Sequence, residues 1–225
     1  MIVKNRKLII VGEGEFAEIA YEYFTHDSDY EVVGFVAERA FLSKDTLYGL
    51  PVSAFEDMEE NYPAQEYDAF VAITSTKLNR IRTRLYQETK QKGYKCATYV
   101  SSHAFVWRNV VLGENTFIFE NNVLQHHVQI GNNVIMWSGN HVGHRSVIED
   151  HNFISSHVVI AGYARINESC FLGVNATIND YLIVAKDCFI ASGALIVKNT
   201  EVGGLYKGAP AKRAEKSVYQ QFNVD

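Results

Sequence analysis

The chain of 225 residues has few cysteines, no run of basic residues and no long apolar run. Its three cysteines are too few for a disulfide framework and fit a reducing compartment. The net charge of -5 and the lack of a basic run argue against nucleic acid or an anionic membrane as the main partner. The apolar segment after Lys7 spans only residues 8–11, too short for a signal peptide or a membrane span. We therefore expect a cytoplasmic protein.

A strict six-residue period dominates the second half of the chain. Every sixth residue from Val100 to Val202 is Val, Ile, Leu or Met, over eighteen consecutive positions. This period is typical of a hexapeptide β-helix, and neither an α-helix nor an isolated strand produces it. Residues eighteen apart then stack at strand spacing, ~4.8 Å. We predict a parallel β-helix over residues 97–203, with all eighteen apolar residues in its core.

Two further positions of the repeat carry a signal. The residue four after each core position is mostly small, so Cys170 and Cys188 are expected to stack in the core as inert apolar residues. Asn122 and Asn140 share one such column and are expected to form a hydrogen-bonded ladder. The residue three after each core position is mostly Asn, Asp, Gly or His, the types that tolerate positive φ. These residues are predicted to form the corners of a triangular prism.

Residues 1–96 have a different pattern, in which strands alternate with helices. We predict strands at 7–11, 30–36, 67–74 and 95–99, and helices at 16–24 and 78–92. Such an alternation implies a parallel sheet, here a small Rossmann-like α/β unit.

The turn after the first strand is a candidate phosphate site. Gly12, Glu13 and Gly14 lie between a strand and a helix, where backbone N–H groups can face an anion. Glu38, at the end of the second strand, stands where a carboxylate would bind a ribose. The unit is too short for two nucleotide-binding halves, so a mononucleotide fits better than NAD. The alternative is a tight turn with no ligand.

Six of the eight histidines lie between residues 126 and 157. His127, His151 and His157 fall at the corner position, so turn geometry alone can explain them. His141 lies on a predicted strand just before a corner, which leaves a structural and a catalytic role open.

His126 and His144 are eighteen residues apart and are expected to stack. Two imidazoles about 5 Å apart oppose each other's protonation, and a general base near pH 7 needs a neutral imidazole. Gly162, one turn further, leaves room beside His144 for a ligand. A metal site is the competing explanation, but the column offers no third ligand of the right kind. We expect a metal-free site.

With these features, the chain resembles the sialic-acid and bacillosamine-type sugar acyltransferases. Apart from the repeat, the segments that carry the resemblance are Gly12-Glu13-Gly14, Gly34-Phe35-Val36, Phe171-Leu172-Gly173-Val174-Asn175 and Lys207-Gly208-Ala209-Pro210-Ala211-Lys212. The resemblance implies a Rossmann-like unit joined to a left-handed parallel β-helix. It also implies an acetyl-CoA-dependent N-acetyltransferase acting on a UDP-, dTDP- or GDP-linked amino sugar for bacterial surface glycans, such as lipopolysaccharide O-antigen.

The resemblance also implies roles for individual residues. His144 matches the family's catalytic base, but Gly143 and Arg145 replace the acidic residues that commonly flank it. The orienting role then falls to His126, Ser138, His141 or a carboxylate of a neighbouring chain. A second family histidine falls at Phe153, and His157 is its expected replacement. The residues implied to line the acetyl-CoA path are His157, Gly162, Gly173, Val174, Pro210 and Lys212. The last two lie in a segment at 204–225 that is implied to close over the cofactor. Residues implied to hold the nucleotide are Gly12, Glu13, Gly14, Glu38 and Thr74.

One outward stripe of the predicted prism is aromatic. It consists of Phe117, Ile135, Phe153, Phe171 and Phe189. Exposed aromatic stripes mark protein interfaces. The resemblance implies that this stripe is the interface of a homotrimer with active sites between subunits. Three alternatives remain open: a sugar O-acetyltransferase, a non-catalytic scaffold that binds a sugar nucleotide and, more weakly, a dehydrogenase.

Overall fold

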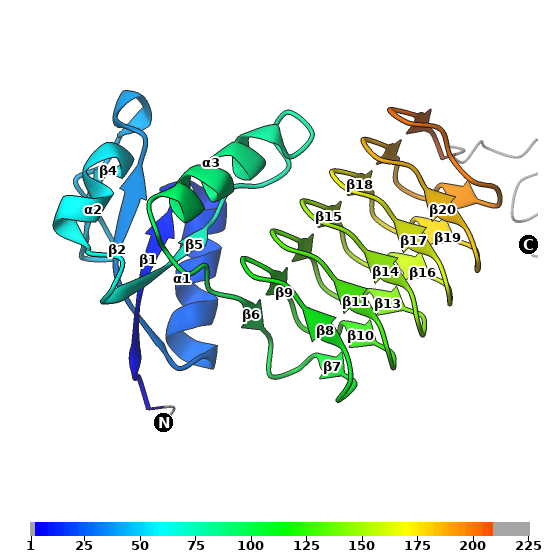
Figure 1. The fold of residues 1–225 in the computed structure, drawn as a ribbon, viewed down its shortest axis with the longest axis horizontal. Coiled ribbons are helices and arrows are strands. Elements are labelled where there is room, and N and C mark those ends of the chain that lie inside the picture. The colour runs from blue at the N-terminus through cyan, green and yellow to red at the C-terminus, as the bar shows by residue number, and fades with distance from the viewer. Residues whose placement is uncertain (1–2, 209–225) are drawn as a thin grey trace, which may run out of the picture.

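The computed structural model describes residues 3–208. The described chain forms an α/β unit followed by a stack of triangular turns, with the α/β unit beside the first turns (Figure 1). Pro210 and Lys212, predicted to contact acetyl-CoA, lie outside the described residues.

The α/β unit has a five-stranded sheet of order β3-β4-β2-β1-β5. The strands are β1 (Arg6–Val11), β2 (Tyr30–Ala37), β3 (Thr46–Leu47), β4 (Leu50–Ala54) and β5 (Tyr67–Val71). The helices are α1 (Glu15–Asp27), α2 (Met58–Asn61) and α3 (Arg80–Gln91), with short 3-10 turns η1 (Arg39–Phe41) and η2 (Phe55–Asp57). Apolar residues of α1 pack on one face of the sheet, and those of α2 and α3 on the other. This three-layer arrangement is the predicted Rossmann-like unit.

Two details of the sheet differ from the prediction. Residues 95–99 do not form a fourth strand of the sheet, because only a single bridge joins Ala69 to Cys96 before the chain leaves for the coil. The antiparallel β3–β4 hairpin was not predicted. Its two-residue loop, Tyr48-Gly49, has φ values of 52° and 76°, which is the two-residue hairpin geometry, but a tyrosine gives no signal for it.

The coil contains three parallel sheets, one on each side of the prism. We name each after its first strand. The β6 sheet comprises β6 (Tyr99–Val100), β9 (Phe117–Ile118), β12 (Ile135–Met136), β15 (Phe153–Ile154), β18 (Phe171–Leu172), β21 (Phe189–Ile190) and β23 (Leu205–Tyr206). The β7 sheet comprises β7 (Phe105–Val106), β10 (Val123–Leu124), β13 (His141–Val142), β16 (Val159–Ile160), β19 (Thr177–Ile178) and β22 (Leu195–Ile196). The β8 sheet comprises β8 (Val111–Leu112), β11 (Gln129–Ile130), β14 (Val147–Ile148), β17 (Arg165–Ile166) and β20 (Ile183–Val184).

Strand partners along the coil are eighteen residues apart, as His141 shows by pairing with Val123 and Val159. This agrees with the predicted left-handed parallel β-helix. The predicted corner residues from Asn115 to Gly193 all have positive φ. Cys170 and Cys188 are fully buried in the core, as predicted.

The six-residue pattern fails at its last position. Val202 is 64% exposed, whereas Ile196 is 5% exposed. After Ile196 the described chain forms no strand of the β8 sheet and returns directly to the β6 sheet at β23, where Leu205 pairs with Phe189 and Tyr206 packs against the core. Among the described residues, no strand follows Val184 at the place that the prediction gave to Val202, and Tyr206 instead occupies the next position in the β6 sheet, beside Ile190.

The predicted asparagine ladder is also wrong in its location. The side chain of Asn122 donates to the carbonyls of Phe119 and Trp137 at 2.8 and 2.9 Å. The Oδ1 atom of Asn140 accepts from the N–H of Val158 at 2.7 Å. These asparagines pair with backbone groups at the corners, because buried backbone polar groups must find partners.

The aromatic stripe of the β6 sheet is covered by the chain's own α1. Phe16 and Phe24 of α1 contact Phe117, with ring centroids 5.5 and 5.9 Å apart. Phe117 and Ile135 are fully buried. The prediction that this stripe is an exposed interface between subunits is therefore wrong over its first turns, and its aromatic surface stabilises the contact between the two parts of one chain.

A buried polar ladder joins the same two parts. The N–H of Val71, at the end of β5, donates to Asn115 Oδ1 at 2.8 Å. Asn115 then donates to Asn133 at 2.9 Å, and Asn133 pairs with Nδ1 of His151 at 3.0 Å. The ladder therefore runs from the α/β sheet across three successive turns of the coil.

Arg82 of α3 is fully buried beside this ladder. Its guanidinium donates to the carbonyls of Asn133, His151 and Asn152 at 3.3, 3.1 and 3.0 Å, and to that of Thr74 at 3.1 Å. Burial lowers the pKa of Arg82 to about 9, so the side chain stays charged at neutral pH. A buried cation bound only by carbonyl dipoles fixes the start of α3 against the coil.

We expect Arg82→Met to lower the free energy of unfolding by about 2–4 kcal/mol, because it leaves several buried carbonyls without a donor. The matched control is Arg80→Met, which removes an exposed pair with Asp187 and should change stability by no more than ~1 kcal/mol. Chemical denaturation of both variants tests this. Equal losses in the two variants would contradict the role given to Arg82.

Candidate active site

His126 and His144 stack at the corner between the β7 and β8 sheets. Each follows a strand of the β7 sheet by two residues, and their ring centroids are 5.3 Å apart with planes inclined by 17°. Partial desolvation lowers the pKa of His126, and the neighbouring His144, His127 and Arg145 lower it further. The structure thus brings together the two histidines that the spacing singled out.

Gln125 contacts His144 and was missed in the sequence analysis. Its Oε1 atom accepts from the backbone N–H of His144 at 2.9 Å and lies 3.3 Å from Nδ1 of the same residue. Because a backbone N–H can only donate, the amide oxygen must be the atom that faces His144. The available signal was positional, since Gln125 directly precedes His126 at the same corner.

Two glycines allow close packing around His144. A Cβ atom added to Gly162 would lie 2.8 Å from Cε1 of His144, so the imidazole rests on the Gly162 backbone. A Cβ added to Gly143 would lie 2.5 Å from the Gly162 nitrogen. No acidic side chain fits at position 143, which explains why the orienting carboxylate is missing there.

The other predicted acetyl-CoA residues lie at a different corner. His157, Gly173 and Val174 follow strands of the β6 sheet and form the corner between the β6 and β7 sheets. His141 lies between the two corners, half-buried on β13. Within one chain, the predicted residues therefore form two groups on opposite edges of the β7 sheet.

Ser138, another candidate to orient His144, is engaged elsewhere. It lies at the β6–β7 corner and donates to Glu120 at 2.6 Å, and Tyr23 of α1 donates to the same carboxylate at 3.0 Å. Burial and this hydrogen bond raise the pKa of Tyr23 to about 12. Although burial opposes it, hydrogen bonding from Ser138 and Tyr23 lowers the pKa of Glu120.

A cavity of about 490 Å³ opens at the ends of β1 and β2. It brings together Gly12, Glu13, Gly14 and Glu38, four of the five residues predicted to hold a nucleotide. Gly12 has a φ of 132°, and a Cβ there would lie 2.9 Å from the carbonyl oxygen of Ala72, so only glycine fits.

Two cations that the prediction missed also line this cavity. Arg84 pairs with Glu38 at 2.9 Å, and Lys77 comes from the loop before α3. Lys77, Leu78 and Asn79 have consecutive φ values of 52°, 48° and 65°. This unfavourable backbone is held by Asn79, which is buried and donates to the carbonyl of Cys170 at 3.1 Å. Neither Lys nor Leu signals a left-handed turn, so the loop was not predicted.

Thr74 lines a second cavity of about 320 Å³ instead of the first. The two cavities share Gly14, Ile73 and Thr76 in their walls, and the second reaches the coil at Trp137. The indole Nε1 of Trp137 is buried and has no hydrogen-bond partner among residues 3–208. The prediction grouped Thr74 with Gly12. The structure instead places Thr74 in a space between the α/β unit and the coil.

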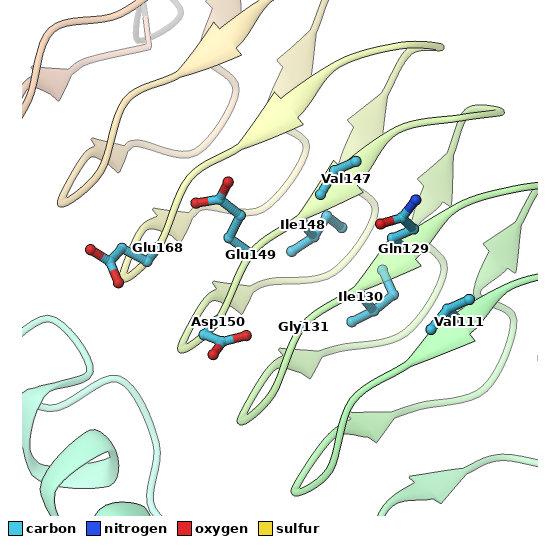
Figure 2. Close-up of a pocket in the computed structure, with 9 residues that line it drawn as sticks. All are labelled: Val111, Gln129, Ile130, Gly131, Val147, Ile148, Glu149, Asp150 and Glu168. Carbon is cyan, nitrogen blue, oxygen red and sulfur yellow. The ribbon is translucent and has the colours of Figure 1, made fainter.

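A third hollow, of about 390 Å³, lies on the β8 sheet (Figure 2). Its acidic side chains are Glu149, Asp150 and Glu168. Glu149 pairs with Arg165, and Asp150 accepts from the N–H of Asn132 at 2.7 Å. Within residues 3–208, no three His, Cys, Asp or Glu side chains are grouped so as to hold a metal ion. In the same range, no helix has the length and apolar character to cross a membrane.

Two family models match the chain. The PglD N-terminal domain matches residues 7–89, and the bacterial transferase hexapeptide (six repeats) matches residues 109–144. The chain thus carries a PglD-type N-terminal domain and transferase hexapeptide repeats, which confirms the predicted resemblance to sugar acyltransferases of this architecture.

Solved structures share the whole fold at low sequence identity. The acetyltransferase domain of PglB from Neisseria gonorrhoeae is 23% identical, with a TM-score of 0.81 over 91% of this chain and 100% of that one. PerB from Caulobacter crescentus, solved with CoA and GDP-perosamine, is 22% identical, with a TM-score of 0.77 over 90% of this chain and 97% of that one. WeeI from Acinetobacter baumannii is 20% identical, with a TM-score of 0.75 over 89% of this chain and 96% of that one.

The stacked histidines give a measurable expectation. In His144→Ala, the pKa of His126 should rise toward its usual value of about 6.5 without reaching it, because the neighbouring charge is removed and the desolvation remains. Titration of the imidazole NMR signals measures this. His157→Ala, at the other corner, is the matched control and should leave His126 unchanged. An unchanged pKa of His126 in His144→Ala would contradict the coupling between the two rings.

Proposed function

We propose that this hexapeptide acyltransferase transfers the acetyl group of acetyl-CoA to the amino group of a nucleotide-linked amino sugar. The observation that carries the proposal is the geometry of His144, whose Nδ1 faces an amide oxygen and so must hold a proton. Its Nε2 atom then has a free lone pair, as a general base requires. The fold shared with PglB and PerB supports the same reaction class.

The reaction is a direct transfer that needs no covalent intermediate on the protein. The sugar amine attacks the thioester carbonyl carbon, and Nε2 of His144 takes the proton that the nitrogen loses. The tetrahedral intermediate collapses with cleavage of the C–S bond, and the CoA thiolate leaves and takes up the proton that His144 received. The products are the N-acetylated sugar nucleotide and free CoA. Cys170 and Cys188 are buried in the core, so neither serves as a nucleophile.

The first cavity suits the nucleotide. Its glycines and the start of α1 offer backbone N–H groups to a diphosphate, and Lys77 and Arg84 add positive charge. Glu38 is placed to accept from the ribose. The second cavity adjoins the first and suits the sugar, because Thr74 and the unpartnered indole N–H of Trp137 can bond its hydroxyl groups.

The complete site requires two copies of the chain. Trp137 belongs to the β6–β7 corner, whereas His144 belongs to the β7–β8 corner. The outward face between these corners carries exposed apolar side chains, among them Phe105, Val159 and Leu195 at 53%, 40% and 61% exposure. Packing this β7 sheet around a three-fold axis would bring the two corners together, so the proposed assembly is a homotrimer.

In this assembly acetyl-CoA lies between neighbouring coils. Gly162 would contact it from the copy that supplies His144, and His157, Gly173 and Val174 from the next copy. Pro210 and Lys212 are the proposed contacts of the C-terminal segment. The proposal places the enzyme in the cytoplasm, in bacterial surface-glycan synthesis.

His144→Ala should lower the rate of acetyl transfer by about 100–10,000-fold, the usual contribution of a general base. Release of CoA thiol measures the rate, with UDP-, dTDP- and GDP-linked amino sugars offered as acceptors. His127→Ala is the matched control, since His127 is an exposed corner residue beside the same pair. Near-full turnover in His144→Ala would exclude the proposed base.

Mixed subunits test the shared site. Thr74→Trp should fill the sugar cavity, so this variant and His144→Ala should each be inactive alone. When the two are unfolded and refolded together, activity should return, because some sites then combine an intact cavity with an intact histidine. The same variants mixed without unfolding are the control. A lack of recovery in refolded trimers, or a monomer in sedimentation, would contradict the arrangement.

A further inference from the structure

We infer that Gln125 is the positioning residue of the active site, and that its neutral amide orients His144 in place of a carboxylate. The kinetic part of this inference rests on the proposed function. The structural part, the choice of tautomer at His144, does not.

Gln125 is itself rigidly placed. It directly follows β10, and its backbone N–H donates to the carbonyl of Val142 at 3.1 Å. Its side chain is half-buried, and the backbone N–H of His144 fixes which end of the amide faces the imidazole. The residue is therefore held at both ends, by the ladder of the β7 sheet and by the turn that carries His144.

The tautomer follows from this contact. The amide oxygen of Gln125 has no proton to give, so Nδ1 of His144 must be the donor. A neutral imidazole with a proton on Nδ1 has its lone pair on Nε2. Without Gln125, His144 would choose its tautomer freely, and a part of the population would carry the proton on the atom that must accept one.

The groups that surround His144 offer no other orienting partner within the described residues. His126 stacks on one face of the ring. The ring of Tyr163 is nearly perpendicular to that of His144, with the two centroids 5.1 Å apart. Gly162 lies against the ring as bare backbone. Arg145 and His127 lie beside His126, the ring stacked on His144. No carboxylate of residues 3–208 forms a hydrogen bond or ion pair with the imidazole, so the amide of Gln125 is the acceptor at Nδ1.

An amide and a carboxylate should differ in one measurable way. Both accept a hydrogen bond, but only a carboxylate attracts the positive charge that the imidazole gains when it takes a proton. Gln125→Glu should therefore keep the orientation and move the acid limb of the kcat/KM profile to higher pH, by roughly 1–2 pH units. A residue with a purely structural role would change the rate without moving that limb.

The kinetic test compares three variants with the wild type. Gln125→Ala should lower kcat by about 10–100-fold, the usual cost of losing an orienting partner, with little change in the KM of either substrate. Gln125→Glu should restore most of that rate and show the shifted profile. Gln129→Glu is the matched control, because it adds the same charge at an exposed position on the β8 sheet and should leave the profile in place.

The tautomer is measured without any substrate, by NMR of histidine labelled with 15N in the full-length protein. In the wild type, Nε2 of His144 should show the shift of a bare nitrogen, and in Gln125→Ala the signals should move toward the Nε2–H form. A proton on Nε2 in the wild type, or an unchanged tautomer in Gln125→Ala, would overturn the inference. If no amino sugar is acetylated, the proposed function fails, and the tautomer result still decides the role of Gln125.

Discussion

The eighteen-residue turn is the constraint on which this structure depends. Each strand of the coil pairs in parallel with the strand one turn earlier, so a residue's position in the turn decides whether it is buried, exposed or at a corner. A substitution or insertion that broke this register would displace every later side chain together. The stacking of His126 on His144 is a direct product of the same register, since no other bond holds the two rings together.

The α/β unit is attached to this coil by contacts of two kinds. Aromatic packing between α1 and the β6 sheet removes a large apolar area from water, which gives strength without much directional preference. The ladder through Asn115 and the carbonyl contacts of Arg82 are directional, and a shift by one turn would break them. The first kind holds the parts together, and the second decides at which level of the coil they meet.

The sequence was most informative where a side chain acts through its place in the repeat. The core, the corners, the buried cysteines and the histidine pair follow from counting residues. Gln125 was not predicted because its role depends on where the end of a flexible side chain points, and periodicity does not show this. The prediction that Phe117 is exposed was wrong for a related reason. Its outward position was clear, but the surface that covers it comes from a helix about a hundred residues earlier.

The site in the α/β unit was only partly predictable. Gly12 and Glu38 follow strand ends, so the parallel sheet places them together. Lys77 reaches the cavity through three left-handed residues that are held by Asn79, a contact with a coil residue ninety-one positions away. No local pattern shows a conformation that a distant contact imposes.

Asn79 and Arg82, with the ladder of asparagines, contact the turns that contain Asn115, Asn133, His151 and Cys170. These contacts fix the position of the α/β unit along the coil axis. Turns added beyond Cys170 would lengthen the prism and leave the distance from the cavities to His144 unchanged. One turn added between Asn115 and His144 would move the histidine by ~4.8 Å along the axis, close to the width of a sugar ring. The segment between the two sites must therefore keep a fixed number of turns.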